Sequence, residues 1–219
     1  MHSSAIDFLM LSAPQLLRGL QQTVVIAASA IVVSTLGGLL FGVLRSLNIP
    51  FVSGVLRLYL ELVRAVPLLV WLFVFFFGLP IALGLDLSSI SCAILVFSLW
   101  GITEVGEVAR GAIQSLPRGQ QEAGLAIGLS RQQLYRYILL PQALRRLIPP
   151  TMNVYTRLIK TTSLSVLIGV TEVIKSGQQI IERTHESLLI YSALFVLYFL
   201  LCFPLSMMAR QLELRWSHG

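Results

Sequence analysis

Charged residues are scarce in this chain. They make up 12% of its 219 residues, whereas soluble domains carry about 25%. Hydrophobic residues make up 56% and form runs long enough for transmembrane helices, each of which needs roughly 20 apolar residues. The runs are continuous rather than alternating, which excludes a membrane β-barrel. The sequence therefore predicts an all-α integral membrane protein with about five transmembrane helices.

Cysteine and histidine are also rare. Cys92 and Cys202 both lie inside apolar runs, so we expect two buried thiols rather than a disulfide. The 3 histidines are scattered and indicate no metal site. No GxxxxGK[ST] phosphate-binding loop occurs, and the nearest match, beginning at Gly169, lacks the second glycine. We therefore expect no enzymatic activity and no cofactor in this chain, so uphill transport would need a partner or an ion gradient.

The apolar runs predict one transmembrane domain covering residues 1–219. The expected spans are residues 16–44, 51–78, 90–113, 143–168 and 188–208. Pro67 is expected to kink or break the second span. Gly37, Gly38 and Gly42 are expected to let another helix approach the first span closely.

The arginines predict the orientation. Basic residues accumulate in cytoplasmic loops, and placing residues 118–141 in the cytoplasm puts most of the 16 basic residues on that side. The N-terminus would then be external and the C-terminus cytoplasmic. Residues 1–15, 78–89 and 171–186 would lie on the outer side.

Charged side chains recur inside the expected spans, where they are costly and normally face a protein interior or a wet cavity. Glu61 and Arg64 share a helical face before Pro67 and are expected to form an ion-paired anchor or to reach the membrane interface. Glu107 and Arg110, three residues apart, predict a structural pair. Glu104 has no such partner nearby in sequence.

The fourth span carries a polar stripe. Its members recur at spacings of three, four and three residues and are Asn153, Thr156, Lys160 and Ser163. Such a stripe is typical of a helix lining a path for a polar solute, although interhelical hydrogen bonding is an alternative for the hydroxyl groups. Glu104 and Lys160 could bind the two charges of a zwitterion, or could instead neutralise each other.

Residues 118–141, RGQQEAGLAIGLSRQQLYRYILLP, form the longest stretch that is not apolar enough for a membrane. They predict two short helices joined by a tight corner. Gly128 can end the first helix in the left-handed conformation. Ser130, with Gln133 three residues later, predicts a capping box for the second helix. Pro141 is expected to interrupt that helix and redirect the chain.

This corner resembles the EAA---G---------I-LP signature of ABC importer permeases. The matching residues are Glu122, Ala123, Gly124, Gly128, Ile138, Leu140 and Pro141. Gly124 departs from the usual alanine, which is expected to loosen the first short helix. Residues 59–69, 107–111 and 160–164 are similar to motifs of the polar amino-acid branch (histidine, glutamine and glutamate permeases). Thr161 stands where that branch often has aspartate, so no role is assigned to it.

The resemblance implies a type I ABC importer permease fold in a bacterial inner (plasma) membrane. It implies two ATP-binding cassette ATPases that bind ATP and Mg, a second permease, identical or homologous, and an external (periplasmic) amino-acid-binding protein. Residues 118–141 would be the cytoplasmic coupling loop. The implied ATPase-coupling residues are Glu122, Ala123, Gly124, Gly128, Ser130, Ile138, Leu140 and Pro141. The expected structural or gating residues are Glu61, Arg64, Pro67, Glu107 and Arg110.

Two other functions fit parts of the sequence. An ion-gradient-driven secondary transporter or channel would also explain polar stripes, although such carriers usually contain an internal repeat that is not evident here. The corner also resembles a DNA-binding helix-turn-helix, with Arg131 and Arg136 for phosphates. The adjoining spans leave no linker to reach DNA, so we expect no nucleic-acid partner.

Overall fold

The computed structural model describes residues 5–47 and 49–217, which contain helices and no strand. This confirms the all-α prediction. The helical elements are α1 (Ala5–Ser46), α2 (Pro50–Ala65), α3 (Leu68–Phe73), a π-helical turn (Val74–Gly78), α4 (Leu79–Leu83), α5 (Ser89–Gln114), α6 (Arg118–Ala126), α7 (Arg131–Leu134), a second π-helical turn (Tyr135–Leu139), α8 (Leu140–Thr161), a 3-10 segment (Thr162–Ile168), α9 (Val173–Thr184) and α10 (Ser187–Ser217).

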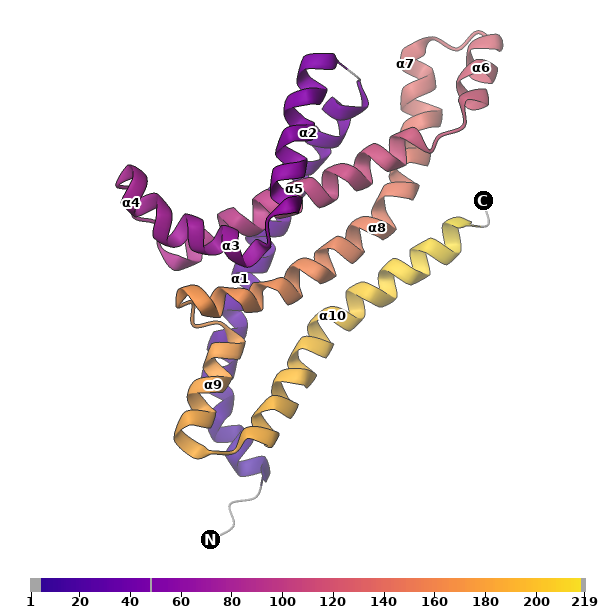
Figure 1. The fold of residues 1–219 in the computed structure, drawn as a ribbon. Helices are drawn as coiled ribbons and strands as arrows, with labels where there is room; N and C mark the ends of the chain where they lie inside the picture. Colours follow the sequence, from indigo (N-terminus) through magenta and orange to yellow (C-terminus); the bar gives the residue numbers. More distant parts are fainter. Residues whose placement is uncertain (1–4, 48, 218–219) are drawn as a thin grey trace.

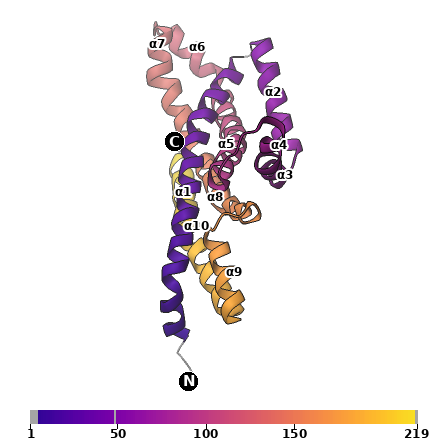
Figure 2. The same ribbon diagram turned by 90° about the vertical axis from the view of Figure 1, so that its left-hand side faces the viewer.

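Helix α5 packs against the second half of α1, whereas the first half of α1 lies beside α9 (Figures 1 and 2). The expected close approach at the glycines of α1 is confirmed. A Cβ atom on Gly38 would lie 2.6 Å from the Val105 Cβ, and one on Gly42 would lie 2.6 Å from the Ala109 Cβ. Small residues allow such backbone contact where larger side chains would clash. Tight packing therefore fixes α5, the helix that leads into the corner, against the longest helix.

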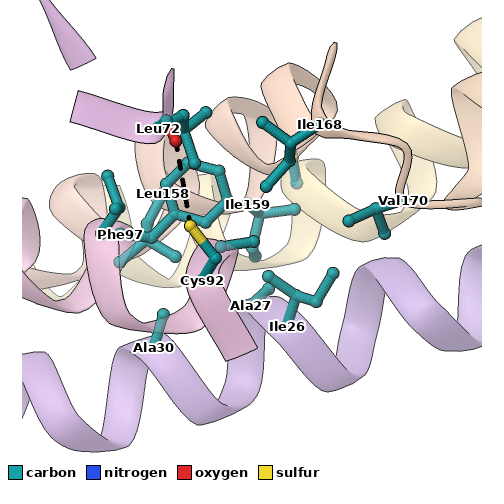
Figure 3. Close-up of a cluster of buried hydrophobic side chains, with 13 residues drawn as sticks. Ile26, Ala27, Ala30, Leu72, Cys92, Phe97, Leu158, Ile159, Ile168 and Val170 are labelled. Atoms are coloured by element: carbon teal, nitrogen blue, oxygen red, sulfur yellow. Dashed lines mark hydrogen bonds between the residues drawn. The ribbon is translucent and has the colours of Figure 1, made fainter. Parts of the chain in front are cut away.

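The main core lies where α1, α3, α5, α8 and α10 converge (Figure 3). Phe97, Leu72 and Leu158 are fully buried there. Cys92 is buried beside them with its Sγ 3.8 Å from the Leu72 carbonyl oxygen, and Cys202 is buried and free as well. The expectation of two buried thiols is confirmed.

Pro67 breaks the second apolar segment, as predicted. Val66 is extended, and the helix pair Pro50–Ala65 and Leu68–Leu83 is bent by 99°. Proline removes a backbone donor and disfavours the helical conformation of the residue before it, which accounts for the break. The expected loop at 78–89 is wrong in its first part, because helix continues to Leu83 and only Gly84–Ser88 connect to α5.

Three helices in the described part of the chain, α1, α5 and α10, are long and apolar enough to cross a membrane, or four if the bent pair counts as one span. This is fewer than the expected five. The fourth expected span falls on α8 and the 3-10 segment. Helix α8 has 22 residues but is too polar to qualify, because Arg145, Arg146, Arg157 and Lys160 interrupt its apolar side chains. It packs against α1, α5 and α10.

The two ends of the molecule differ. The corner formed by α6 and α7 projects at one end, whereas α9 and the beginning of α1 lie at the other (Figures 1 and 2). Helix α1 begins at Ala5 rather than near residue 16, and at ~1.5 Å per residue its length is about 60 Å, twice the ~30 Å hydrocarbon thickness of a bilayer.

Candidate functional site

The predicted corner at residues 118–141 is present, and its turn is built around Gly128. Gly128 has φ +83°, in the left-handed region. The Gly128 N–H donates to the Leu125 carbonyl at 3.0 Å, and the Leu129 N–H donates to the Gly124 carbonyl at 3.1 Å. These two bonds form a Schellman motif, which satisfies the last carbonyls of a helix through a left-handed residue. The corner is therefore a defined turn rather than a loose loop.

The second helix of the corner begins with the predicted capping box. The Gln133 N–H donates to Ser130 Oγ at 3.3 Å, and the Ser130 N–H donates to Gln133 Oε1 at 2.9 Å. Each bond satisfies a backbone donor that has no partner inside the helix. The start of α7 is thereby fixed directly after the turn.

Gly124 belongs to the interior of the corner. It is buried, and a Cβ atom on it would lie 2.6 Å from the Leu134 Cδ1. The glycine lets Leu134, which is 2% exposed, pack directly onto the α6 backbone. The expectation that Gly124 loosens α6 did not take this packing into account. Leu134 of α7 occupies the space that the methyl group of an alanine at position 124 would fill.

The corner exposes several apolar side chains among its polar ones. Ile127 is 77% exposed, and Leu125 and Tyr135 are also exposed. Glu122, Ala123 and Ser130 are exposed beside them, Leu140 and Pro141 are exposed on the following helix, and Ile138 is half-buried. An exposed apolar patch bordered by polar groups is typical of a protein interaction site.

Pro141 does not end the second helix. The chain continues as a π-helical turn, Tyr135–Leu139, into α8. A wider turn is a common way to accommodate an interruption of the α-helical hydrogen bonds. The expected change of direction is seen between α7 and α8 (Figure 1). The helix is not interrupted there, however, but widens into the π-helical turn.

The two helices that enter and leave the corner are joined at its base. The Arg146 guanidinium, on α8, donates to the carbonyl and, at 3.0 Å, to the Oγ of Ser115, which caps the C-terminus of α5. Gln142 Nε2 donates to Gln120 Oε1 at 3.4 Å. A positive charge at the carbonyl end of a helix is favourable. These hydrogen bonds therefore join α8 to α5 and to α6 at the base of the corner.

Glu104 lies at the junction of α2, α5 and α8. Its Oε1 is 3.1 Å from Arg64 Nη2 and its Oε2 is 2.6 Å from Arg157 Nη2. The Glu104 side chain is 14% exposed, whereas Arg64 and Arg157 are 41% and 56% exposed. The Arg157 guanidinium also lies 5.7 Å from the Trp100 ring centroid, within cation–π range. The Glu104 carboxylate is thus ion-paired with two arginines whose side chains are exposed at the surface.

Among the described residues, Glu104 is ion-paired with Arg64 and Arg157 and not with Lys160, so the two groups do not neutralise each other. Lys160 and Ser163 instead line a cavity of about 480 Å³ with Tyr198 and Phe199 of α10. The polar stripe also differs from the prediction. Thr156 is 6% exposed and its hydroxyl donates to the Met152 carbonyl at 3.1 Å.

Arg157, which the sequence interpretation missed, completes the exposed face of α8. Asn153, Arg157 and Lys160 are exposed at spacings of four and three residues. That spacing places the three residues on one side of the helix, just as the spacing of the predicted polar stripe does. The sequence could not reveal that Arg157 is the partner of Glu104, because no spacing rule links two residues 53 positions apart.

The predicted pair of Glu107 and Arg110 is confirmed. Arg110 Nε is 3.0 Å from Glu107 Oε1, and Arg45 of α1 pairs with the same carboxylate. Arg110 continues to Gln114 Oε1 at 2.8 Å. Glu61 has no ion pair among residues 5–47 and 49–217, since Arg64 turns to Glu104 instead. The expected anchor is therefore an interhelical pair.

Glu172 is a further site that the sequence interpretation missed. It is 0% exposed. Its Oε1 accepts the Lys175 N–H at 3.0 Å, which caps α9, and its Oε2 lies 3.3 Å from the hydroxyls of both Thr23 and Tyr198. A Cβ on Gly19 would lie 2.9 Å from the Glu172 carbonyl oxygen. One carboxyl group therefore joins α1, α9 and α10.

Sequence comparisons agree on one kind of protein. The profile of the binding-protein-dependent transport system inner membrane component family matches residues 34–218. The glutamine transport system permease protein GlnP of Escherichia coli (strain K12) is 36% identical, covering 92% of this chain and 93% of the relative. The probable amino-acid ABC transporter permease protein YckA of Bacillus subtilis (strain 168) is 32% identical, covering 94% and 91%.

Solved structures share the fold. A chain from an amino acid ABC transporter crystallised with histidines has a TM-score of 0.86 at 23% identity, covering 98% of this chain and 100% of that one. A chain from the inward-facing MetNI methionine ABC transporter has a TM-score of 0.72 at 19% identity, covering 90% and 95%. These matches confirm the resemblance first carried by the corner. The chain belongs to the family of inner membrane components of binding-protein-dependent transport systems.

Proposed function

We propose that this chain is the membrane-spanning permease subunit of an ATP-driven importer of polar amino acids. The observation that carries the proposal is the capped corner of α6 and α7, which bears the EAA-type signature and projects from one end of the bundle (Figure 1). Family membership and the names of the relatives support the transport class and the amino-acid substrate. This assignment disfavours an ion-driven carrier and a helix-turn-helix regulator.

The proposed assembly has two such permeases, identical or homologous, on two ATP-binding cassette ATPases. ATP and Mg bind in the ATPases, and an external binding protein delivers the amino acid. The positive-inside bias supports an inner-membrane subunit with an external N-terminus and a cytoplasmic C-terminus. This orientation places the exposed apolar face around Ile127 in the cytoplasm, where an ATPase can cover it.

The corner acts as a lever in this proposal. Its Schellman turn, capping box and buried Leu134 give it one shape, so force applied at Ile127 moves α6 and α7 together. Arg146 and Ser115 join α5 to α8 at the base of the lever. Those two helices carry Glu104 and Arg157, so movement of the corner changes the geometry of the polar face.

We further propose that the polar face of α5 and α8 forms part of the substrate path. Trp100, Glu104 and Arg157 lie together there. Asn153 and Lys160 are exposed on the same side of α8 as Arg157, and Ser163 lines the cavity beside Lys160. The α-carboxylate of an amino acid can replace Glu104 on an arginine, and its ammonium group can bind the carboxylate thus released. Thr156 is buried and is expected to support the helix instead.

A Glu104→Gln substitution tests this path. The amide retains the shape of the side chain but cannot neutralise Arg64 and Arg157, so we expect amino-acid uptake to fall about tenfold, equivalent to ~1.4 kcal/mol. Because both arginines are partly exposed, thermal stability should change by only ~1 kcal/mol. Uptake is measured with radiolabelled amino acid.

The double variant Glu104→Gln/Arg157→Gln provides the control. If the two groups act together, the double variant loses less uptake than the product of the two single losses. Strictly multiplicative losses would contradict a shared role, and Glu182→Gln, an exposed carboxylate on α9, should have no effect.

The assembly is tested by purifying the tagged subunit from the membranes of its own host. We expect an ATPase with a phosphate-binding loop to co-purify. Leu134→Ala, which removes the buried centre of the corner at a cost of about 2–5 kcal/mol, should release that ATPase while leaving the subunit in the membrane. Purification without any ATPase, under conditions that preserve other membrane complexes, would refute the proposal.

A further inference from the structure

A cavity of about 690 Å³ lies at the corner end of the molecule, apart from the proposed substrate path. Its walls come from the junction of α5 and α6, from the first half of α8 and from the last turns of α10. Ser115, Gln120, Arg145, Glu213 and Trp216 are among its lining residues. The proposed transport mechanism uses none of this volume.

Two opposite charges line the cavity without neutralising each other. Within residues 5–47 and 49–217, Arg145 and Glu213 have neither an ion pair nor a side-chain hydrogen bond, with each other or with another group. The neighbouring Arg146 is already bound to Ser115. The cavity therefore offers one free guanidinium and one free carboxylate to a ligand.

A free guanidinium and a free carboxylate in one cavity complement a zwitterion. Guanidinium groups bind phosphate and carboxylate oxygens, and carboxylates accept hydrogen bonds from a primary ammonium group. The side-chain amide of Gln120 adds hydrogen-bonding groups to the lining of the same cavity. The recognised chemistry is therefore an oxyanion and a primary ammonium group within one small unit.

The bilayer is the favoured source of this unit. Trp216 lies in the last turn of α10, about two helical turns beyond the apolar run that ends at Met208, and tryptophan is enriched where a membrane helix reaches the interface. Basic pockets between helices on the cytoplasmic side bind lipid headgroups. The cavity thus combines the charge pattern of a zwitterion with a place at the end of a helix that is apolar enough to cross a membrane.

We propose that this cavity binds the headgroup of a phosphatidylethanolamine-type lipid, with its phosphate on Arg145 and its ammonium group on Glu213. The inference rests on the proposed cytoplasmic orientation of the corner. Because Gln120 belongs to α6 and Glu213 to α10, the bound headgroup links the coupling corner to the C-terminal helix.

The test uses the intact importer in lipid nanodiscs, with bound lipid measured by native mass spectrometry. Phosphatidylethanolamine should be retained in preference to phosphatidylcholine, whose quaternary ammonium donates no N–H bond. Glu213→Gln should reduce this preference about fivefold or more, and Arg145→Gln should weaken retention of both lipids. Arg215→Gln, an exposed arginine of α10 that does not line the cavity, is the matched control and should retain the wild-type preference.

Equal retention of both lipids by the wild-type importer would overturn the proposal. So would an unchanged preference in the Glu213→Gln variant, or unchanged retention of both lipids in the Arg145→Gln variant. Soluble phosphoethanolamine or free amino acid could instead displace the lipid at a concentration lower than that of the lipid. That result would identify a cytoplasmic solute as the occupant and would also overturn the lipid assignment. Lipid retention is read without transport, so failure here is distinguishable from absence of ATP-driven uptake.

Discussion

A Gly128→Val subunit is expected to insert into the membrane and to assemble, but to hydrolyse ATP without moving amino acid. Gly128 has φ +83°, and an L-residue in that region costs roughly 1–2 kcal/mol, with β-branched side chains among the least tolerated. No atom lies within 4 Å of a Cβ at this position, so strain of the turn, rather than a clash, is the cause. The Schellman bonds of α6 would be lost and the lever would bend.

The measurement is the ratio of ATP hydrolysed to amino acid transported in membrane vesicles. We expect uptake to fall by more than about tenfold while hydrolysis persists, since ~1.4 kcal/mol corresponds to a factor of ten. Gly128→Asn should retain most uptake because asparagine tolerates the left-handed conformation. Gly54→Val, at an α2 glycine with equally open surroundings but without a positive φ, controls for the added bulk. Normal coupled transport by the valine variant would disprove the lever role.

A Glu172→Ala subunit is expected to lose about 3 kcal/mol of stability. The substitution removes the side-chain cap of α9, which typically contributes ~1 kcal/mol. It also leaves the half-buried Tyr198 hydroxyl without its acceptor and removes one of the two acceptors of the buried Thr23 hydroxyl, which keeps the Gly19 carbonyl at 3.2 Å; together these losses cost about 2 kcal/mol. Because these groups belong to α1 and α10, the outer ends of three helices should separate.

Thermal unfolding of the detergent-solubilised protein checks this prediction. A loss of about 3 kcal/mol corresponds to a fall in Tm of roughly 6–12 °C for a chain of this size. Glu182→Ala on the same helix removes an exposed carboxylate that has no hydrogen-bond partner in the described part of the chain, and its Tm should change little. An unchanged Tm for Glu172→Ala would show that the buried carboxyl does not stabilise the helix junction.

The features predicted well from the sequence are those set by neighbours along the chain. The left-handed Gly128, the capping box of Ser130 and the break at Pro67 each follow from a few adjacent residues. The same holds for the pair of Glu107 and Arg110, three residues apart. The overall class follows from the apolar runs.

The features missed depend on which helices meet. Glu104 bonds to Arg157 across 53 positions, and Glu172 bonds to Thr23 across 149; no local spacing encodes either contact. Gly124 shows the same limit, because its role depends on where Leu134 packs. The polar side chains of α8 were attributed to a solute path or to interhelical hydrogen bonds, whereas the Thr156 hydroxyl bonds back to its own helix.

The source of energy is the most direct test of the proposed function. The purified subunit, its ATPase and the external binding protein would be reconstituted in proteoliposomes, with ATP trapped inside and ionophores collapsing all ion gradients. We expect amino acid to accumulate against its gradient only with ATP and the binding protein, and accumulation to cease with Gly128→Val. Accumulation driven by an imposed ion gradient without ATP would contradict the assignment.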